Sequence, residues 1–208
     1  FKGTAHLSPL QVINSLEKLG GELNAYTAKE ETVYYAAILR QFFTIAVDVL
    51  TDIVFRSTYP PAEMAMEMEV VCDEIDSYRD NPAELIYDEF ESRVFRARPL
   101  GHSVLGTKDN VRSFTTEHCK RFTKTWYRPD NAVFYVLGNV DFQRLVIRLE
   151  RLLSDYPAAL PTVPSSAGIV IPEKPVDGNG ILRQEEDYVC DEELQTHQSH
   201  VMTGLAFT

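Results

Sequence analysis

The sequence predicts a fold of the α+β class, because segments with helical character and segments with strand character both occur along it. Apolar residues recur at helical spacing through residues 42–55 and again through 61–80. Two segments, 23–27 and 32–39, read as strands on either side of a polar turn at 28–30. With 44% hydrophobic residues among 208, the chain can bury a sizeable core.

The first helix is expected directly after Ser8. Ser8 and Gln11 form a capping-box pattern, and Pro9 occupies the first helical position. Gly20-Gly21 supplies the stop signal at the other end. The apolar stripe of this helix consists of Val12, Ile13, Leu16 and Leu19.

Prolines divide the helical region that follows the two strands. Tyr59-Pro60-Pro61 ends the helix at 42–55, and Pro61 also begins the next helix, which runs to about residue 80. Asn81-Pro82 interrupts the pattern, because a residue before proline avoids the helical region, and a further helix is expected at 83–96. The stripe of the helix at 61–80 consists of Met64, Met68, Val71, Ile75 and Tyr78.

The second half of the chain is expected to alternate between helices and strands. A loop at 98–108 precedes a helix at 116–126, a strand at 132–137, and a helix at 141–154 that Asp141 caps. Residues 157–180 hold five of the eleven prolines and are predicted to form a linker or extended arm. Two short strands, 181–189 and 199–206, are expected to close the chain.

Charge and hydropathy exclude two classes of partner. The net charge is −11 and the isoelectric point is near 4.9. Nucleic acid and anionic membrane surfaces both require clustered lysine and arginine, so neither is expected as a partner. The longest apolar region, residues 33–55, is broken by Arg40, Asp48 and Asp52, and we therefore expect no membrane-spanning helix.

The cysteines Cys72, Cys119 and Cys190 are odd in number and widely spaced. They form neither a disulfide framework nor a metal-binding C-x-x-C pair, so free thiols are expected. Free thiols favour a reducing compartment such as the cytoplasm. The chain begins with Phe1 and shows no signal-peptide pattern, which indicates a processed or shortened fragment.

Glu67 and Glu74 are the candidate functional residues of the helix at 61–80. They are seven residues apart and therefore lie on nearly the same helix face. Glu74 falls within roughly 60° of Val71 and Tyr78, at 100° per residue, so its carboxylate is expected to face partly inward. A charge in that position needs a cation, a hydrogen-bond partner or a metal. The alternative from the residues alone is a solvated acidic face.

Four segments together resemble the pitrilysin-like (M16, inverzincin) zinc peptidases. They are Phe1-Lys2-Gly3-Thr4, Gly20 to Thr27, Glu31 to Tyr35, and Glu67 to Ile75. The resemblance is strong over residues 1–155 and weak over 180–208. It implies an α+β fold in which helices pack on an antiparallel or mixed sheet. In this family an H-x-x-E-H zinc motif lies immediately before an F-K-G-T segment, so the chain begins just after the point where that motif ends.

The resemblance also implies roles for the two glutamates. Glu74 corresponds to the third zinc ligand and Glu67 to the carboxylate that supports the site. Catalytic zinc takes three protein ligands and keeps one position for water. Both histidine ligands and the general-base glutamate belong to the H-x-x-E-H motif, which the 208 residues lack. Zinc is thus implied for the longer protein, while this chain alone is expected to bind no zinc and to be inactive.

The segment Asn24-Ala25 matches the strand that binds substrate in the family. There an extended peptide adds to a sheet edge as an extra strand, with its scissile bond near the metal. Asn24 and Ala25 are therefore the candidate substrate contacts, and a plain hairpin strand is the alternative. His197 and His200 lie in a segment that reads as a strand, where they would face opposite sides, so no metal site is expected there.

These patterns predict part of a zinc metalloendopeptidase that hydrolyses peptides or small unfolded proteins. Residues 1–156 would form a truncated first M16 domain, 157–180 a linker, and 181–208 closing strands that include the start of a second homologous half. A second M16 half or a partner subunit is expected. We also expect the strand at 200–207 to cover an exposed sheet edge, or to pair between copies of the chain. The alternatives are a non-catalytic structural or partner subunit and a small α+β binding module.

Overall fold

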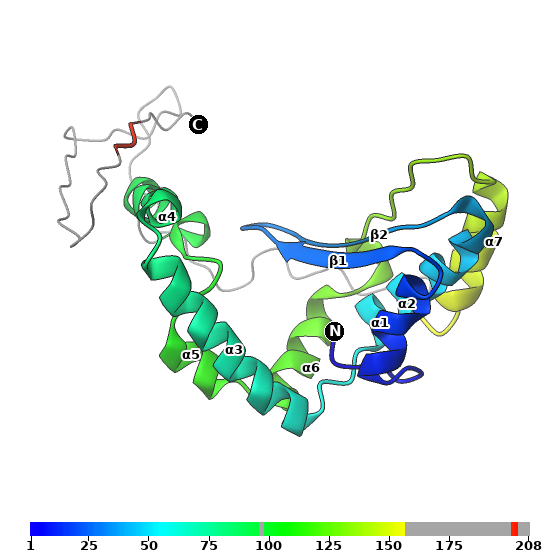
Figure 1. Ribbon diagram of the computed structural model, residues 1–208, viewed down its shortest axis with the longest axis horizontal. Coiled ribbons are helices and arrows are strands. Elements are labelled where there is room, and N and C mark those ends of the chain that lie inside the picture. The colour runs from blue at the N-terminus through cyan, green and yellow to red at the C-terminus, as the bar shows by residue number, and fades with distance from the viewer. Residues whose placement is uncertain (96–97, 157–200, 204–208) are drawn as a thin grey trace.

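The computed structural model describes residues 1–95, 98–156 and 201–203. Helices make up most of the described chain, and two strands form a hairpin near its start (Figure 1). In chain order the elements are α1 (Pro9–Glu17), β1 (Glu22–Thr27), β2 (Thr32–Ala37), η1 (Arg40–Phe42), α2 (Phe43–Arg56), α3 (Pro61–Arg79), α4 (Pro82–Phe95), η2 (Pro99–Gly101), α5 (Lys108–Ser113), α6 (Thr116–Trp126), η3 (Pro129–Asn131) and α7 (Phe142–Leu152).

Local sequence signals determine α1 and the hairpin as predicted. The Ser8 side chain accepts a hydrogen bond from the Gln11 backbone N–H, and the Gln11 side chain accepts one from Ser8 N–H, which completes the capping box. Gly20 has a φ of +73°, which favours glycine after a helix. A Cβ on Gly21 would lie 3.0 Å from the Ile38 side chain, so the chain can pass close to β2 only because this residue is glycine.

The hairpin strands pair antiparallel, with Asn24 opposite Tyr35 and Ala25 opposite Tyr34. The hydrogen bond from Ala28 N–H to Glu31 C=O closes the turn at 2.8 Å. Because hydrogen-bonded and non-hydrogen-bonded pairs alternate, Ala25 and Tyr34 form a non-hydrogen-bonded pair. The backbone N–H and C=O of Ala25 therefore point away from β2, toward the open edge of β1.

A first apolar cluster joins the hairpin to α1 and α2. Its buried members are Val12, Val49 and Ile53, and partly buried Leu23 and Tyr34 of the hairpin pack against them. Helix α7 also packs on α2, where Arg148 Nε donates to Asp48 Oδ1 at 2.7 Å. Helices thus pack on the sheet, and the expected α+β class is confirmed.

A second apolar cluster lies between α3 and α5. Cys72 and Ile75 of α3 and Val111 of α5 are buried there. Helix α4 contacts the end of α3, and η2 contacts α4. Figure 1 shows α3, α4 and α5 at one end of the molecule and α1, α2 and α7 at the other, with the hairpin running between them. Among the described helices none is long and apolar enough to cross a membrane.

The strand expected at 132–137 is wrong. The backbone there is extended but has no regular secondary structure, and Val133, Tyr135 and Leu137 are 95%, 79% and 88% exposed. A strand needs a neighbouring backbone to bond with, and in the described part of the chain β1 and β2 bond only to each other. Helix α5 was not expected; it lies at the end of the loop predicted for 98–108 and just beyond it.

The predicted linker at 157–180 and the strand at 181–189 lie outside the described residues. The strand at 199–206 lies there as well, except for residues 201–203, which have no regular secondary structure.

Candidate functional site

Helix α3 carries both candidate glutamates, and the start of the chain lies against it. Lys2 Nζ is 2.7 Å from Glu67 Oε2, and both side chains are about half buried. The hydrogen bond to Glu67 raises the pKa of Lys2, and the negative charge of Glu63 on the same helix acts in the same direction. The ion pair therefore fixes the first residues of the chain beside the face of α3 that bears Glu67.

Glu74 does not face inward, which corrects the sequence expectation. Its side chain is exposed, and it makes no hydrogen bond or ion pair with another described residue. The buried face of α3 is centred on Cys72 and Ile75, which lie about 160° and about 100° around the helix from Glu74. The apolar stripe predicted for this helix did not include Cys72. The centre of the predicted buried face therefore lay too close to Glu74.

The segment Phe1-Lys2-Gly3-Thr4 is held on three sides. The Phe1 ring lies 6.4 Å from the ring of Tyr34, centroid to centroid, and Tyr34 is the β2 residue opposite Ala25. Thr4 pairs with Ser57 in an isolated bridge, and its hydroxyl donates to the buried carboxylate of Asp52 at the end of α2. The segment thereby lies between the hairpin, the end of α2 and α3.

The candidate substrate residues lie on the open edge of β1. Asn24 is exposed and Ala25 is partly buried, as the predicted alternation requires. Ala25 N–H, which points away from β2, donates to the Asn24 side-chain oxygen at 2.8 Å. The Asn24 side chain therefore occupies the hydrogen-bonding position that the carbonyl of an added strand would take.

The described residues do not by themselves fit a catalytic zinc ion. No group of three or more His, Cys, Asp or Glu in the described part of the chain could hold a metal. A catalytic zinc site needs three protein ligands, and Glu74 can supply one. Two further ligands would have to come from residues beyond those that the structure describes.

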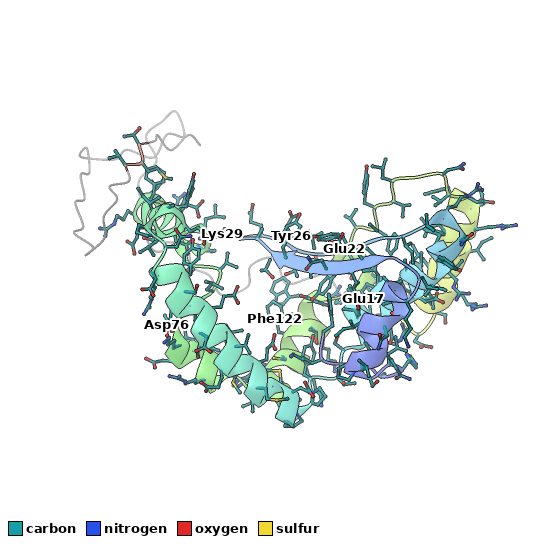
Figure 2. All side chains as sticks on the ribbon, in the orientation of Figure 1. Glu17, Glu22, Tyr26, Lys29, Asp76 and Phe122 are labelled. Atoms are coloured by element: carbon teal, nitrogen blue, oxygen red, sulfur yellow. The ribbon has the colours of Figure 1, made fainter. Side chains whose placement is uncertain are left out.

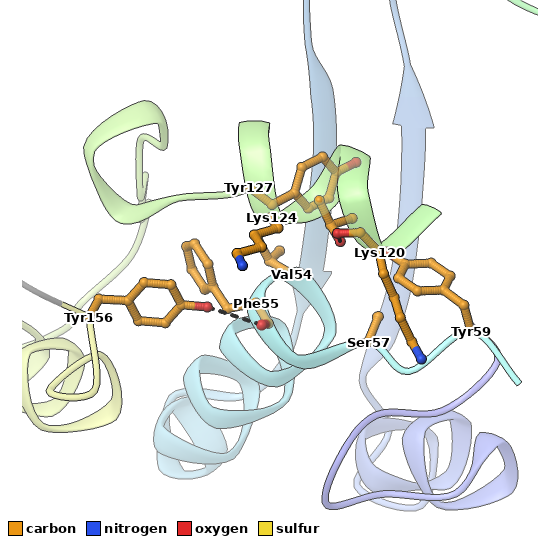
Figure 3. Close-up of a pocket in the computed structure, with 9 residues that line it drawn as sticks. Val54, Phe55, Ser57, Tyr59, Lys120, Lys124, Tyr127 and Tyr156 are labelled. Atoms are coloured by element: carbon orange, nitrogen blue, oxygen red, sulfur yellow. Dashed lines mark hydrogen bonds between the residues drawn. The ribbon is translucent and has the colours of Figure 1, made fainter. Parts of the chain in front are cut away.

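Two hollows lie elsewhere on the molecule. Figure 3 shows the first, of about 250 Å³, between the end of α2, helix α6 and Tyr156, whose hydroxyl donates to Phe55 C=O at 3.1 Å. Burial raises the pKa of Tyr59 in its wall. The second, of about 640 Å³, lies between the start of α2 and the start of α7. None of Asn24, Ala25, Glu67 and Glu74 lines either of them.

Two lysine contacts were not expected from the sequence: the ion pair of Lys2 with Glu67, and that of Lys29, at the turn of the hairpin, whose Nζ lies 3.2 Å from Asp88 Oδ1 on α4. Lys2 belongs to the segment on which the resemblance rests, and its opposite charge to Glu67 is the one signal that could have suggested the pair. Lys29 reads as an ordinary polar turn residue. Both contacts join residues far apart in the chain, so no local pattern reveals them.

Comparisons with known proteins identify the family of the chain. Residues 1–108 match the profile of the family Insulinase (Peptidase family M16), and residues 113–207 match that of the Peptidase M16 inactive domain. An uncharacterized zinc protease of Rickettsia felis is 35% identical over 185 residues, which cover 89% of this chain and 43% of that protein. The mitochondrial-processing peptidase subunit beta of Neurospora crassa is 31% identical over 189 residues, which cover 91% of this chain and 39% of that protein.

The fold also matches solved structures. The crystal structure of a protease from Helicobacter pylori superposes with a TM-score of 0.73 at 20% identity, over 79% of this chain and 40% of that one. The chain therefore spans less than half the length of the relatives it matches.

Proposed function

Because the chain belongs to the M16 peptidase family, we propose that it is part of a zinc-dependent metalloendopeptidase that hydrolyses peptides or small unfolded proteins. The observation that carries the proposal is the position of Phe1 and Lys2 between α3 and the hairpin. Residues preceding Phe1 in a longer protein would enter beside Glu67. Relatives that carry the name zinc protease support the same activity.

Glu74 is the proposed zinc ligand, together with two imidazoles from outside these 208 residues. Its carboxylate is exposed and pairs with no other described residue, so within the described part of the chain it can bind a cation without first breaking another contact. Bound zinc would lower the pKa of its water ligand to about 7. Glu67 is the proposed supporting carboxylate, because its ion pair with Lys2 fixes the segment that would follow the upstream ligands.

The proposed substrate is an extended peptide that adds to the open edge of β1. Leu23, Ala25 and Thr27 all belong to non-hydrogen-bonded pairs, so their backbone groups point outward. An incoming carbonyl would replace Asn24 Oδ1 as the acceptor for Ala25 N–H. Asn24 thus satisfies the Ala25 amide until a peptide arrives, and its side chain would then be released to contact the peptide.

The wider assembly follows from the same proposal. Residues 1–156 would belong to a first M16 domain, 157–180 to a linker and 181–208 to closing strands, with a second M16 half or a partner subunit completing the assembly. An open sheet edge also allows a homo-oligomer. A reducing compartment is consistent with the free thiols of Cys72 and Cys119.

The test is a matched pair of substitutions in the longer protein that includes the upstream residues. Glu74→Gln removes the charge of the proposed ligand, and Asp73→Asn makes the same change on the neighbouring exposed residue of α3. We expect Glu74→Gln to lose bound zinc and hydrolysis of a quenched fluorogenic peptide, and Asp73→Asn to keep both. A Glu74→Gln protein that kept zinc and activity would show that Glu74 is no ligand.

A second candidate function is a non-catalytic structural or partner subunit. It is favoured by the match of residues 113–207 to the inactive-domain profile. The same experiment separates the two, because a non-catalytic subunit would contain no stoichiometric zinc and would hydrolyse no peptide even before substitution.

A further inference from the structure

Lys29 lies at the turn of the β1–β2 hairpin and contacts a distant part of the chain. Its Nζ is 3.2 Å from Asp88 Oδ1 and 3.1 Å from Glu91 Oε2, both on α4. It also donates to the His102 carbonyl at 2.6 Å. Figure 2 shows Lys29 at the tip of the hairpin, beside α4. The turn of the hairpin is thereby attached to α4 and to the segment after η2.

Every N–H donor of the Lys29 ammonium group has a hydrogen-bond acceptor. Three acceptors meet its three N–H donors, and the Lys29 and Asp88 side chains are each only 20% exposed. Burial acts to lower the pKa of Lys29, but the hydrogen bonds to Glu91 and Asp88 outweigh it, so the pKa is raised. A charged, largely buried side chain with all donors used has little freedom to move.

The hairpin is therefore fixed at both ends. At its base Leu23 and Tyr34 pack into the first apolar cluster. At its tip Lys29 binds to α4. The open edge of β1 runs from Asn24 and Ala25, which lie beside the base contacts, to the turn that bears Lys29, and nothing in the described residues pairs with that edge. Helix α4 continues from α3, so the tip contact also sets the position of this edge relative to the helix that bears Glu74.

We propose that Lys29 is a positioning residue for peptide binding, which holds the free edge of β1 in place relative to α3 through Asp88, Glu91 and the His102 carbonyl. The inference rests on the proposed function, because it assumes that an extended peptide adds to β1. Lys29 itself touches no substrate. Its effect is to order in advance the strand that the peptide must bind, which reduces the entropy lost on binding.

The kinetic test compares Lys29→Ala, Lys29→Arg and the control Lys18→Ala in the longer protein. Lys18 is exposed at the end of α1, away from the hairpin tip. Losing a partly buried charged contact should raise KM for peptides about tenfold and leave kcat within about twofold, since a tenfold change corresponds to about 1.4 kcal/mol. Arginine keeps the charge and should recover most of the loss, and Lys18→Ala should change neither constant. An unchanged KM in Lys29→Ala would overturn the proposal.

A second readout does not depend on activity. In the 208-residue chain, hydrogen exchange of β1 and β2 amides should become faster in Lys29→Ala, with α1 and α2 unchanged. Binding of a fluorescein-labelled, proline-free unstructured peptide should weaken in parallel. Faster exchange throughout the chain would mean that Lys29 only stabilises the fold. If Lys29→Ala does not fold, Asp88→Asn removes one of the two negative charges around the Lys29 ammonium group and tests the same contact. The longer protein could hydrolyse no peptide while the chain still binds the labelled peptide and Lys29→Ala shows the predicted hydrogen exchange. That result would refute the proposed function and leave the role of Lys29 standing.

Discussion

The hydroxyl groups of Tyr34 and Tyr127 lie 3.2 Å apart and join β2 to the residue that follows α6. The two rings meet edge to face, with centroids 6.2 Å apart. Tyr34 also contacts the Phe1 ring and lies opposite Ala25, so it connects the start of the chain, the candidate substrate strand and α6.

The free energy of unfolding should fall at alkaline pH because Tyr34 ionises less readily in the folded chain than in the unfolded chain. Burial, followed by the hydrogen bond to Tyr127, raises the pKa of Tyr34 above the value of about 10 expected in the unfolded chain. Its contribution is therefore fully present below about pH 10 and is lost as pH rises toward the folded-state pKa, because the unfolded chain ionises first. Tyr34→Phe should reduce the slope of unfolding free energy against pH by up to about 1.4 kcal/mol per unit in this range.

Urea unfolding at a series of pH values from about 8 to 11 would measure this slope. Tyr26→Phe is the matched control, because Tyr26 lies on the same hairpin with 53% of its surface exposed. An equal change of slope in the two variants would contradict the role of Tyr34.

Helix α3 should depend on its second apolar cluster for stability. Ile75 is 3% exposed and packs with Cys72 and Val111, whereas Val70 on the same helix is 58% exposed. Ile75→Ala should lower the unfolding free energy by about 2–4 kcal/mol, through lost burial and the cavity left behind. Val70→Ala should change it by no more than about 0.5 kcal/mol. Similar losses in chemical denaturation of both variants would contradict the packing described for α3.

Local signals in the sequence predicted the elements whose determinants are local. The capping box of Ser8 and Gln11, the turn at 28–30 and the breaks at Pro61 and Pro82 each depend on neighbouring residues, and the structure confirms them. The resemblance to the M16 peptidases is confirmed by the match over residues 1–108. These features could be read from the sequence because a few adjacent side chains decide them.

Features that depend on distant parts of the chain could not be predicted in this way. The direction of Glu74 depends on which face of α3 meets α5, and periodicity alone did not identify Cys72 as part of that face. The contact between Lys29 and Asp88 joins residues 59 positions apart. A strand at 132–137 required a pairing partner as well as an apolar sequence, and the described residues offer none. The roles of Asn24, Ala25, Glu67 and Glu74 stay predictions.

The extended segment at 132–137 should promote self-association of the 208-residue chain. Val133, Tyr135 and Leu137 alternate along it and are 79–95% exposed, so three large apolar side chains within five residues are in contact with water. Within the described part of the chain this backbone pairs with no strand, and unpaired backbone beside such residues favours pairing with another chain. Burying one of these side chains is worth about 1.5–3 kcal/mol, so Val133→Lys combined with Leu137→Lys should weaken association at least about tenfold. Sedimentation velocity across a wide range of protein concentration would measure this.

The control for this prediction is Ile147→Lys. Ile147 is 63% exposed on α7 and lies outside the extended segment, so its substitution should leave the association constant unchanged. A wild-type chain that stayed monomeric at every concentration would contradict the prediction. So would an equal effect of Ile147→Lys, because it would mean that association follows the general apolar character of the surface and does not depend on the segment at 132–137.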